Sequence, residues 1–204
     1  MSAKRLVALV VPVLVLAATA LAQVNELSAT AGRTFVSTQT VPSTGLPIHF
    51  GNPASFEIDY GRLLKTHRIF GLYAELPVEV VPKTNLNYFY DVIPRSFGSV
   101  FATPSVRVNF FSSDSVTPWL SAGGGYGHFS QSSNLIWYGT NPGPTSTNTG
   151  VIQFGGGLDV WFWPRWGVRV EARDFYSGNP ALNVDTGNSR QHNYYVGAGV
   201  AHRF

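Results

Sequence analysis

Residues 193–204 read Asn-Tyr-Tyr-Val-Gly-Ala-Gly-Val-Ala-His-Arg-Phe and end the chain. Side chains two positions apart share a face of a β-strand, so Tyr194 and Val196 share one face and Arg203 lies on the other. The first face is mostly apolar, whereas the second is small or charged. A free terminus normally frays into water, where an exposed Phe is unfavourable. The pattern therefore predicts a terminal strand that has one face in lipid.

The composition is poor in charge. Charged residues make up 12% of the chain, aromatic residues 14% and hydrophobic residues 44%, whereas soluble domains carry about 25% charged residues. Without Lys4 and Arg5, which lie in the leader described next, 12 basic residues stand against 11 acidic ones. No excess of positive charge therefore favours nucleic acid. The chain has no cysteine, which excludes disulfides and thiolate metal sites.

Residues 1–22 have the three parts of a secretory signal peptide. A basic pair precedes an apolar run over residues 6–16, and Ala20-Leu21-Ala22 supplies a small-residue cleavage site. The run is shorter than the roughly 20 residues that a spanning helix needs, so an uncleaved anchor helix is the less favoured alternative. We expect export, removal of residues 1–22, and a single domain over residues 23–204.

Eight runs of alternating residues follow the leader, and short and long connections separate them in strict turn. Short turns on the periplasmic side and longer loops outside are typical of outer-membrane barrels. The long connections are rich in turn formers, and we expect them to be exposed and mobile. The runs are Glu26–Phe35, Ser55–Leu64, Ile69–Val80, Val100–Phe111, Trp119–Ser130, Gly150–Trp163, Gly167–Tyr176 and Asn193–Phe204. The long connections are residues 36–54, 81–99, 131–149 and 177–192.

Alternation alone also fits a soluble sandwich, but three observations favour a membrane barrel. The runs have about 9 to 12 residues, the length that a tilted strand needs to cross the hydrocarbon. Glycine within the runs, as in residues 123–125 and 155–157, permits tight curvature. Aromatic residues gather near the ends of the runs, as in interfacial girdles, namely Trp161, Trp163, Trp166, Tyr176, Tyr194 and Tyr195. The sequence therefore predicts an all-β fold, an eight-stranded antiparallel up-and-down transmembrane β-barrel preceded by a cleaved signal peptide.

Several of these runs resemble the small outer-membrane β-barrel domain family of the OmpA/OmpX type. The resemblance covers residues 23–204 and implies the barrel fold, but it implies no particular activity. The chain departs from OmpA-type proteins in lacking the periplasmic peptidoglycan-binding domain that follows their barrel, and it has His202 where the terminal motif favours an aromatic or aliphatic residue. The resemblance is carried by Trp119–Gly127, Phe154–Asp159, Arg169–Tyr176 and the terminal Phe204.

Charged residues fall on the face that we predict to point into the barrel. Eight strands enclose an interior that side chains just fill, and unpaired charges there are costly. We therefore expect a paired, hydrogen-bonded plug, with a narrow, gated ion path as the alternative. The inward residues are Glu57, Asp59, Glu75, Asp159 and Glu171, with Arg107, Arg169, Arg173 and Arg203.

Catalytic motifs are scarce. The chain has neither the G-x-S-x-G nor the H-E-x-x-H pattern. His128-Phe129-Ser130 loosely resembles the His-x-Ser arrangement of the lipid A deacylase barrels, in which the pair lies on a later strand and a carboxylate orients the histidine. No acid near His128 can be assigned from the sequence. Asp185, His192 and His49 show no repeated ligand spacing, so we assign no catalytic, cofactor-binding or metal-binding residue and no cofactor.

We predict an integral outer-membrane β-barrel protein that is not an enzyme, has a structural or surface-interaction role and acts as a monomer. The alternatives are an outer-membrane lipid-modifying hydrolase and a narrow ion channel. We expect outer-membrane lipids and lipopolysaccharide as partners, together with the barrel-assembly machinery, which recognises Phe204, and no nucleic acid. The loop aromatics Trp137-Tyr138 and Tyr88-Phe89-Tyr90 either contact a partner or lipopolysaccharide, or belong to the upper aromatic girdle.

Overall fold

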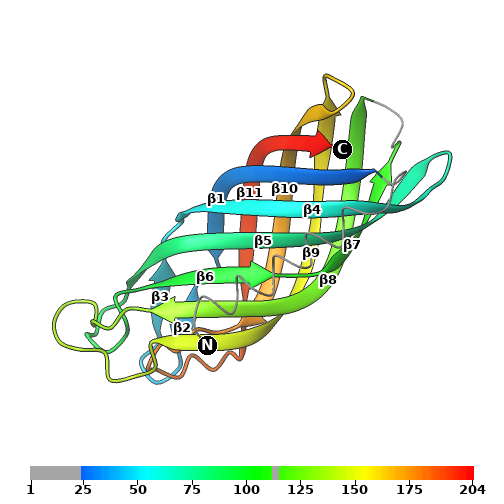
Figure 1. Cartoon of the computed structure of the whole chain (residues 1–204). Coiled ribbons are helices and arrows are strands. Elements are labelled where there is room, and N and C mark those ends of the chain that lie inside the picture. Colours follow the sequence, from blue (N-terminus) through cyan, green and yellow to red (C-terminus); the bar gives the residue numbers. More distant parts are fainter. Residues whose placement is uncertain (1–23, 112–114) are drawn as a thin grey trace, which may run out of the picture.

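The computed structural model describes residues 24–111 and 115–204, and all the elements in these ranges are strands (Figure 1). The predicted signal peptide, residues 1–22, lies outside the described residues. Within the two described ranges no helix is long and apolar enough to span a membrane. The strands are β1 (Asn25–Val36), β2 (Gln39–Val41), β3 (Leu46–Phe50), β4 (Ala54–Thr66), β5 (Phe70–Asn87), β6 (Ser96–Ala102), β7 (Ser105–Phe110), β8 (Val116–Gln131), β9 (Ser146–Trp161), β10 (Trp166–Gly178) and β11 (Arg190–Arg203).

The wall of the molecule is a closed antiparallel ring in the order β1, β4, β5, β6 with β7, β8, β9, β10 and β11. β6 and β7 act as one wall strand, because both pair with β5 and with β8. The wall strand is interrupted at Thr103 and Pro104, and proline has no N–H for the ladder. The eight-stranded barrel predicted from the sequence is confirmed.

The ring closes between the first and last strands. Glu26 lies opposite Arg203 in this register, and Asn25 and Phe204 exchange two backbone hydrogen bonds of 2.9 Å each. The pairing therefore extends to the final residue, as the alternation over residues 193–204 predicts.

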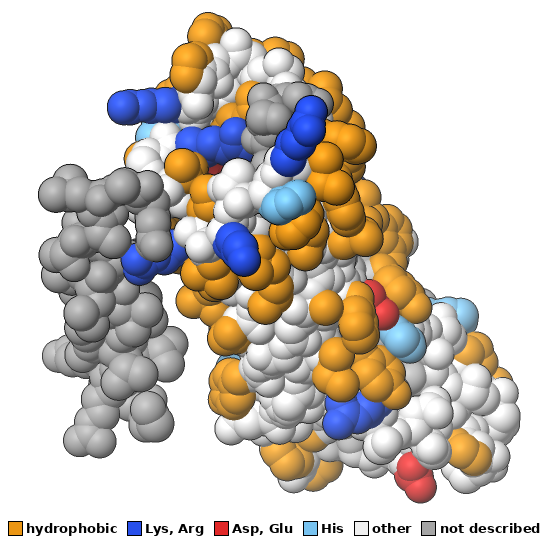
Figure 2. All heavy atoms as spheres, turned by 90° about the vertical axis from the view of Figure 1, so that its right-hand side faces the viewer, with side chains coloured by type: hydrophobic (Ala, Val, Ile, Leu, Met, Phe, Trp, Pro, Cys, Tyr) orange, Lys and Arg blue, Asp and Glu red, His pale blue; other side chains and the backbone are white. Residues whose placement is uncertain are grey.

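On every second position of the wall strands, large apolar side chains point outward into the surroundings of the barrel. Figure 2 shows such side chains spread over the wall, with Lys and Arg side chains gathered near its upper end. A closed barrel with an apolar outer face suits a lipid environment, because each wall strand pairs with a neighbour on both sides and leaves no open edge. Members of this belt from different wall strands are Leu27, Ile58, Val106, Leu120, Phe154, Val170 and Val200.

The predicted aromatic girdle is correct for some residues and wrong for two. Trp163, Trp166 and Tyr194 are exposed on the outside. Trp161 and Tyr195 instead point into the barrel and are buried, because the two-residue period of a strand places them one position away from the outward set. Inside the barrel, the Arg203 guanidinium group lies over the Trp161 ring, and the Tyr195 hydroxyl lies 2.7 Å from the Thr30 hydroxyl.

The long connections contain strands and buried residues that we did not predict. Residues 36–54 contain the hairpin of β2 and β3, and β3 pairs with the extended end of β5. Phe101 packs on Phe129 and Phe175 with ring centroids 5.6 and 5.3 Å apart. The expectation that these connections are exposed is wrong for several residues, because they join an apolar cluster that closes this end of the barrel. This loop-end cluster contains Val41, Ile48, Leu86, Tyr88, Ile93, Phe97, Phe101, Phe129, Val151, Phe175, Leu182 and Tyr195.

Candidate functional site

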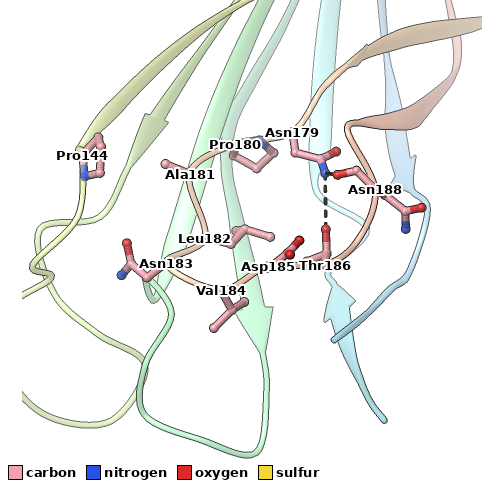
Figure 3. Close-up of a pocket in the computed structure, with 10 residues that line it drawn as sticks. All are labelled: Pro144, Asn179, Pro180, Ala181, Leu182, Asn183, Val184, Asp185, Thr186 and Asn188. Carbon is pink, nitrogen blue, oxygen red and sulfur yellow. Dashed lines mark hydrogen bonds between the residues drawn. The ribbon is translucent and has the colours of Figure 1, made fainter. Parts of the chain in front are cut away.

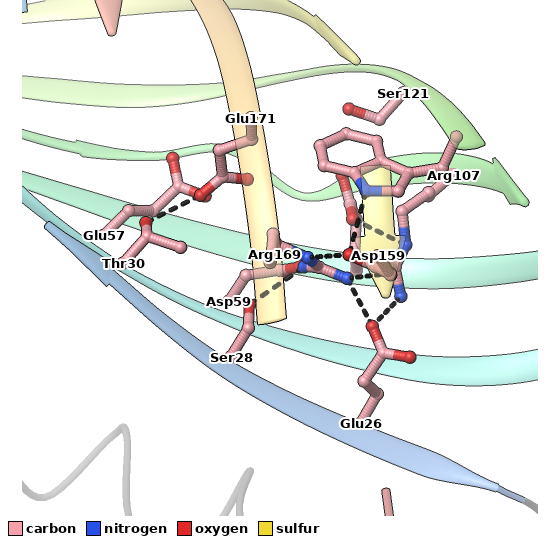
Figure 4. Close-up of polar contacts among 12 residues, drawn as sticks. Glu26, Ser28, Thr30, Glu57, Asp59, Arg107, Ser121, Asp159, Arg169 and Glu171 are labelled. Carbon is pink, nitrogen blue, oxygen red and sulfur yellow. Dashed lines mark hydrogen bonds and ion pairs between the residues drawn. The ribbon is translucent and has the colours of Figure 1, made fainter. Parts of the chain in front are cut away.

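The charged residues of the interior meet in the half of the barrel that lies toward the short turns. Alternation brings them there, because every second residue of each wall strand points inward. Figure 4 shows Arg169 among carboxylates that come from several different strands. All nine residues predicted to face inward do so, and Arg203 alone among them is partly exposed.

Arg169 uses its whole guanidinium group. Its Nε and Nη2 donate to the two carboxylate oxygens of Asp159 at 2.8 and 2.9 Å. Nη1 donates to Asp59 and to the Ser28 hydroxyl, both at 2.9 Å, and Nη2 also donates to Glu26. A planar fork with five donors matches this arrangement, whereas a lysine ammonium does not.

Two further arginines extend the network. Arg107 contacts Glu26 at 2.6 Å and Glu75 at 3.2 Å. Arg173 contacts Glu57 and Glu75, each at 2.9 Å. Since Glu26 contacts three arginines and Glu75 contacts two, the charges form one connected cluster, in which pairing offsets much of the cost of burial.

Trp119 lies at the centre of this cluster. The guanidinium carbons of Arg107, Arg169 and Arg173 lie 5.6, 5.1 and 4.8 Å from its ring centroid, within the range of cation–π attraction. Its indole N–H donates to Asp159 at 3.3 Å. The indole therefore separates three like charges and fills the space between them.

Two acids of this interior were not predicted from the sequence. Glu26 and Glu79 are buried with the predicted acids, which makes seven buried acids among the described residues instead of the five predicted. Glu26 shares a face with Ser28 and Thr30 in the first run, so its alternation with small apolar residues could have identified it. Glu79 lies beyond the predicted charges on the same face as Glu75, and Thr34 donates to it.

The loop end carries a cavity of about 450 Å³, lined mainly by the connection between β10 and β11 (Figure 3). The Asn179 side-chain amide donates there to both the Thr186 hydroxyl and the Asn188 carbonyl. Asp185 is the one charged residue among those lining the cavity. Such a lining suits a neutral polar group.

The histidines considered as metal ligands lie apart. The Asp185 carboxylate accepts the Gly187 N–H at 2.8 Å, whereas His192 contacts Asp174 at 2.7 Å on the outer face of β10 and β11. His49 lies on β3. Within residues 24–111 and 115–204 no group of three or more candidate ligands could hold a metal ion.

The outer rim carries an ordered relay of three side chains, His128, Ser130 and Asn148. His128 Nδ1 lies 2.7 Å from Asn148 Oδ1, and Ser130 Oγ lies 3.3 Å from His128 Nε2. Tyr126 donates to the same Asn148 oxygen at 2.6 Å. An amide oxygen accepts from Nδ1–H, which leaves the Nε2 lone pair for the Ser130 hydroxyl.

The strand register explains this relay. His128 on β8 lies directly opposite Asn148 on β9, and Ser130 shares the outward face of β8 with His128, as predicted. The sequence left the orienting partner of His128 unassigned. In the structure this partner is an amide on the neighbouring strand, which no motif indicates.

No protein-family model matches the chain, and no curated protein matches it in sequence. Solved structures of small outer-membrane barrels do match its fold. OprG from Pseudomonas aeruginosa has a TM-score of 0.59 at 9% identity, with 90% of this chain and 96% of that chain covered. Neisserial surface protein A has a TM-score of 0.54 at 17% identity, with 88% and 97% covered.

A third structure with this fold is PagL, described as an outer-membrane enzyme, with a TM-score of 0.53 at 15% identity and coverage of 85% and 97%. At these identities the likeness establishes the fold. The predicted resemblance to small barrels of the OmpA/OmpX type is therefore confirmed for the architecture. The predicted location in the outer membrane agrees with this fold and with the apolar outer belt.

We predict that Arg169→Met destabilises the barrel strongly. The change leaves Glu26, Asp59 and Asp159 without their shared cation, and breaking a buried ion pair costs about 3–5 kcal/mol. Urea unfolding in lipid vesicles measures the loss. The matched control is Arg68→Met at the exposed short-turn end, which we expect to change stability by less than about 0.5 kcal/mol. Equal stability of both variants contradicts the role given to the cluster.

Proposed function

We propose that this chain, an eight-stranded barrel of the outer-membrane type, closes its own interior and uses its long-loop end as an interaction surface. The observation that carries the proposal is the linked set of loops at that end. They present aromatic side chains outward from a fixed frame.

The interior offers no support for a transport role. The charged cluster around Trp119 fills the half of the interior toward the short turns, and the loop-end cluster fills the other half. Phe97, Phe101 and Phe129 stack edge to face across the upper half, with centroids 5.6 Å apart in each neighbouring pair. A solute therefore meets two different barriers, one of charge and one of packed rings.

Hydrogen bonds hold the loops to each other. The Asp91 carboxylate accepts the backbone N–H groups of Trp137 and Tyr138 at 2.8 and 2.9 Å. The Asn183 side-chain amide donates to Asn141 at 2.7 Å and to the Val92 carbonyl at 3.1 Å. Three connections that are distant in sequence thus form one surface, and a pre-ordered surface loses less entropy when it binds.

Exposed aromatic side chains lie on this surface. Phe89 is 75% exposed and Tyr138 is 85% exposed, and Tyr90 and Trp137 lie beside them in the linked loops. Tyr88 is instead buried in the loop-end cluster, so it anchors the segment. Rigid aromatic side chains are the usual anchors of binding interfaces, which favours a partner contact over a purely structural role. We call Phe89, Tyr90, Trp137 and Tyr138 the aromatic tip.

A second candidate function is ester hydrolysis at the outer rim. The relay of Ser130, His128 and Asn148 has the order of a nucleophile, a base and an orienting group. An amide serves as the orienting group in papain-like enzymes. His128 lies opposite the exposed Val100 on β6, and the substrate that we propose is an ester of an outer-leaflet lipid. PagL is an enzyme with this fold, so the fold itself is compatible with catalysis.

For the closed interior we expect small or no conductance in planar-bilayer recordings. The reason is that the charged cluster and the loop-end cluster lie one after the other along the barrel axis. A porin recorded under the same conditions provides the control for insertion and detection. Large, steady currents from the folded barrel contradict the proposal.

For the aromatic tip we expect the double variant Phe89→Ser and Tyr138→Ser to lose binding without losing stability. Proteoliposomes carrying the wild type or the variant are tested on arrays of glycans and of extracellular proteins. Unfolding in urea should change by less than about 0.5 kcal/mol, because both side chains are exposed. Tyr88→Ser is the matched control, and we expect it to be destabilising. If the double variant binds as strongly as the wild type, the aromatic tip is not the binding surface.

For the relay we expect a fluorophosphonate probe to label Ser130 in the wild type only if the site is hydrolytic. Ser130→Ala and His128→Asn should then abolish labelling and the release of fatty acid from lipid A, followed by mass spectrometry. Ser132→Ala, in the adjacent loop, is the control and should have no effect. Wild-type protein that neither reacts with the probe nor releases acyl chains, beside an active control enzyme, excludes this function.

A further inference from the structure

Among residues 24–111 and 115–204, the exposed charges are divided unequally between the two ends of the barrel. At the loop end, partly or fully exposed acids accompany the exposed bases, so the net charge there is small. At the short-turn end the described residues include no exposed acid. The loop-end charges are Asp91, Asp174 and Asp185 with Arg33, Lys83, Arg95 and Arg190. The basic residues of the short-turn end are Arg62, Lys65, Arg68, Arg165 and Arg203.

A cavity of about 410 Å³ opens inside this basic rim. Its walls combine Arg165 and Arg203 with the apolar side chains of Leu63 and Phe204. The backbone fixes the two arginines next to each other, because the Arg203 N–H donates to the Arg165 carbonyl at 2.8 Å. A charged pair therefore adjoins an apolar wall at the mouth of the barrel.

Arg203 is only partly used by the protein. Its Nε donates to Glu26 at 3.3 Å, and its guanidinium carbon lies 3.5 Å from the centroid of the Trp161 ring. Its Nη2 is buried and has no hydrogen-bond partner among the described residues. An arginine donor that is left without a partner suits an oxyanion such as a phosphate.

We propose that this basic mouth binds the phosphate headgroup of an anionic glycerophospholipid in the periplasmic leaflet. Basic side chains beside a membrane attract anionic headgroups, and each contributes through the local surface potential. The short turns lie at the periplasmic face. Lys65 at the end of β4 and Arg68 in the β4–β5 turn follow and precede the exposed apolar residues Leu64 and Ile69. An anion that carries acyl chains gains from both the charge and the wall, whereas a free anion gains from the charge alone.

The test uses the folded full-length barrel in neutral detergent and native mass spectrometry. Dioleoylphosphatidylglycerol, dioleoylphosphatidylcholine and inorganic phosphate are titrated separately. We expect retention of the phosphatidylglycerol only. The triple variant Lys65→Gln, Arg68→Gln and Arg165→Gln should bind it at least about tenfold more weakly.

The matched control removes the same charges from the other end, by Lys83→Gln, Arg95→Gln and Arg190→Gln. It should bind phosphatidylglycerol like the wild type. A gel that compares heated and unheated samples reports folding of each variant. Should the triple variant fail to fold, wild-type binding must still weaken severalfold when salt rises from 50 to 300 mM, because exposed charge pairs are screened.

Three results overturn the proposal. Equal retention of both lipids removes the role of charge, and an equal loss in the two triple variants removes the role of the short-turn end. Retention of inorganic phosphate at the same concentrations makes the mouth a free-anion site without lipid preference. None of these results bears on the aromatic tip, which lies at the opposite end.

Discussion

The packing of three guanidinium groups around one indole is the interaction on which the barrel interior depends. A ring of eight strands leaves a core that side chains must fill, and the lipid outside reserves the other face for apolar residues. Polar residues of the wall are thereby directed inward, where each must find a partner. Trp119 keeps the three guanidinium groups apart. It lies between Arg107, Arg169 and Arg173 while each of them still contacts carboxylates.

The two halves of the interior are filled in different ways, one by ion pairs and the other by apolar packing. Near the short turns, Arg169 and its carboxylates make many directional contacts, which tolerate little displacement. Near the loops, Phe101 and Phe129 pack as in a soluble core, and the loop connections complete that core. The barrel interior is thus ion-paired toward the short turns and packed with apolar side chains toward the loops.

Much of this fold follows from alternation, and the parts that do not follow have identifiable causes. The period of two assigns Asp159 and Arg169 to the interior, and the structure agrees. The same period assigns Trp161 and Tyr195 to the interior. We placed them in the girdle because they are aromatic, and the structure agrees with the period. Asn148 could not be predicted as the partner of His128, because the register of β8 against β9 depends on a long connection whose path has no sequence motif.

The pairing of β1 with β11 carries a consequence for how the molecule is made. Glu26 and Arg203 are separated by 177 positions, so the ring stays open until nearly all of the chain has been delivered. Until then, the strands at the two open edges of the wall expose unpaired backbone groups together with apolar side chains. This combination is prone to aggregation. The wall can therefore close only when β11 has paired with β1, and until then both edges stay open.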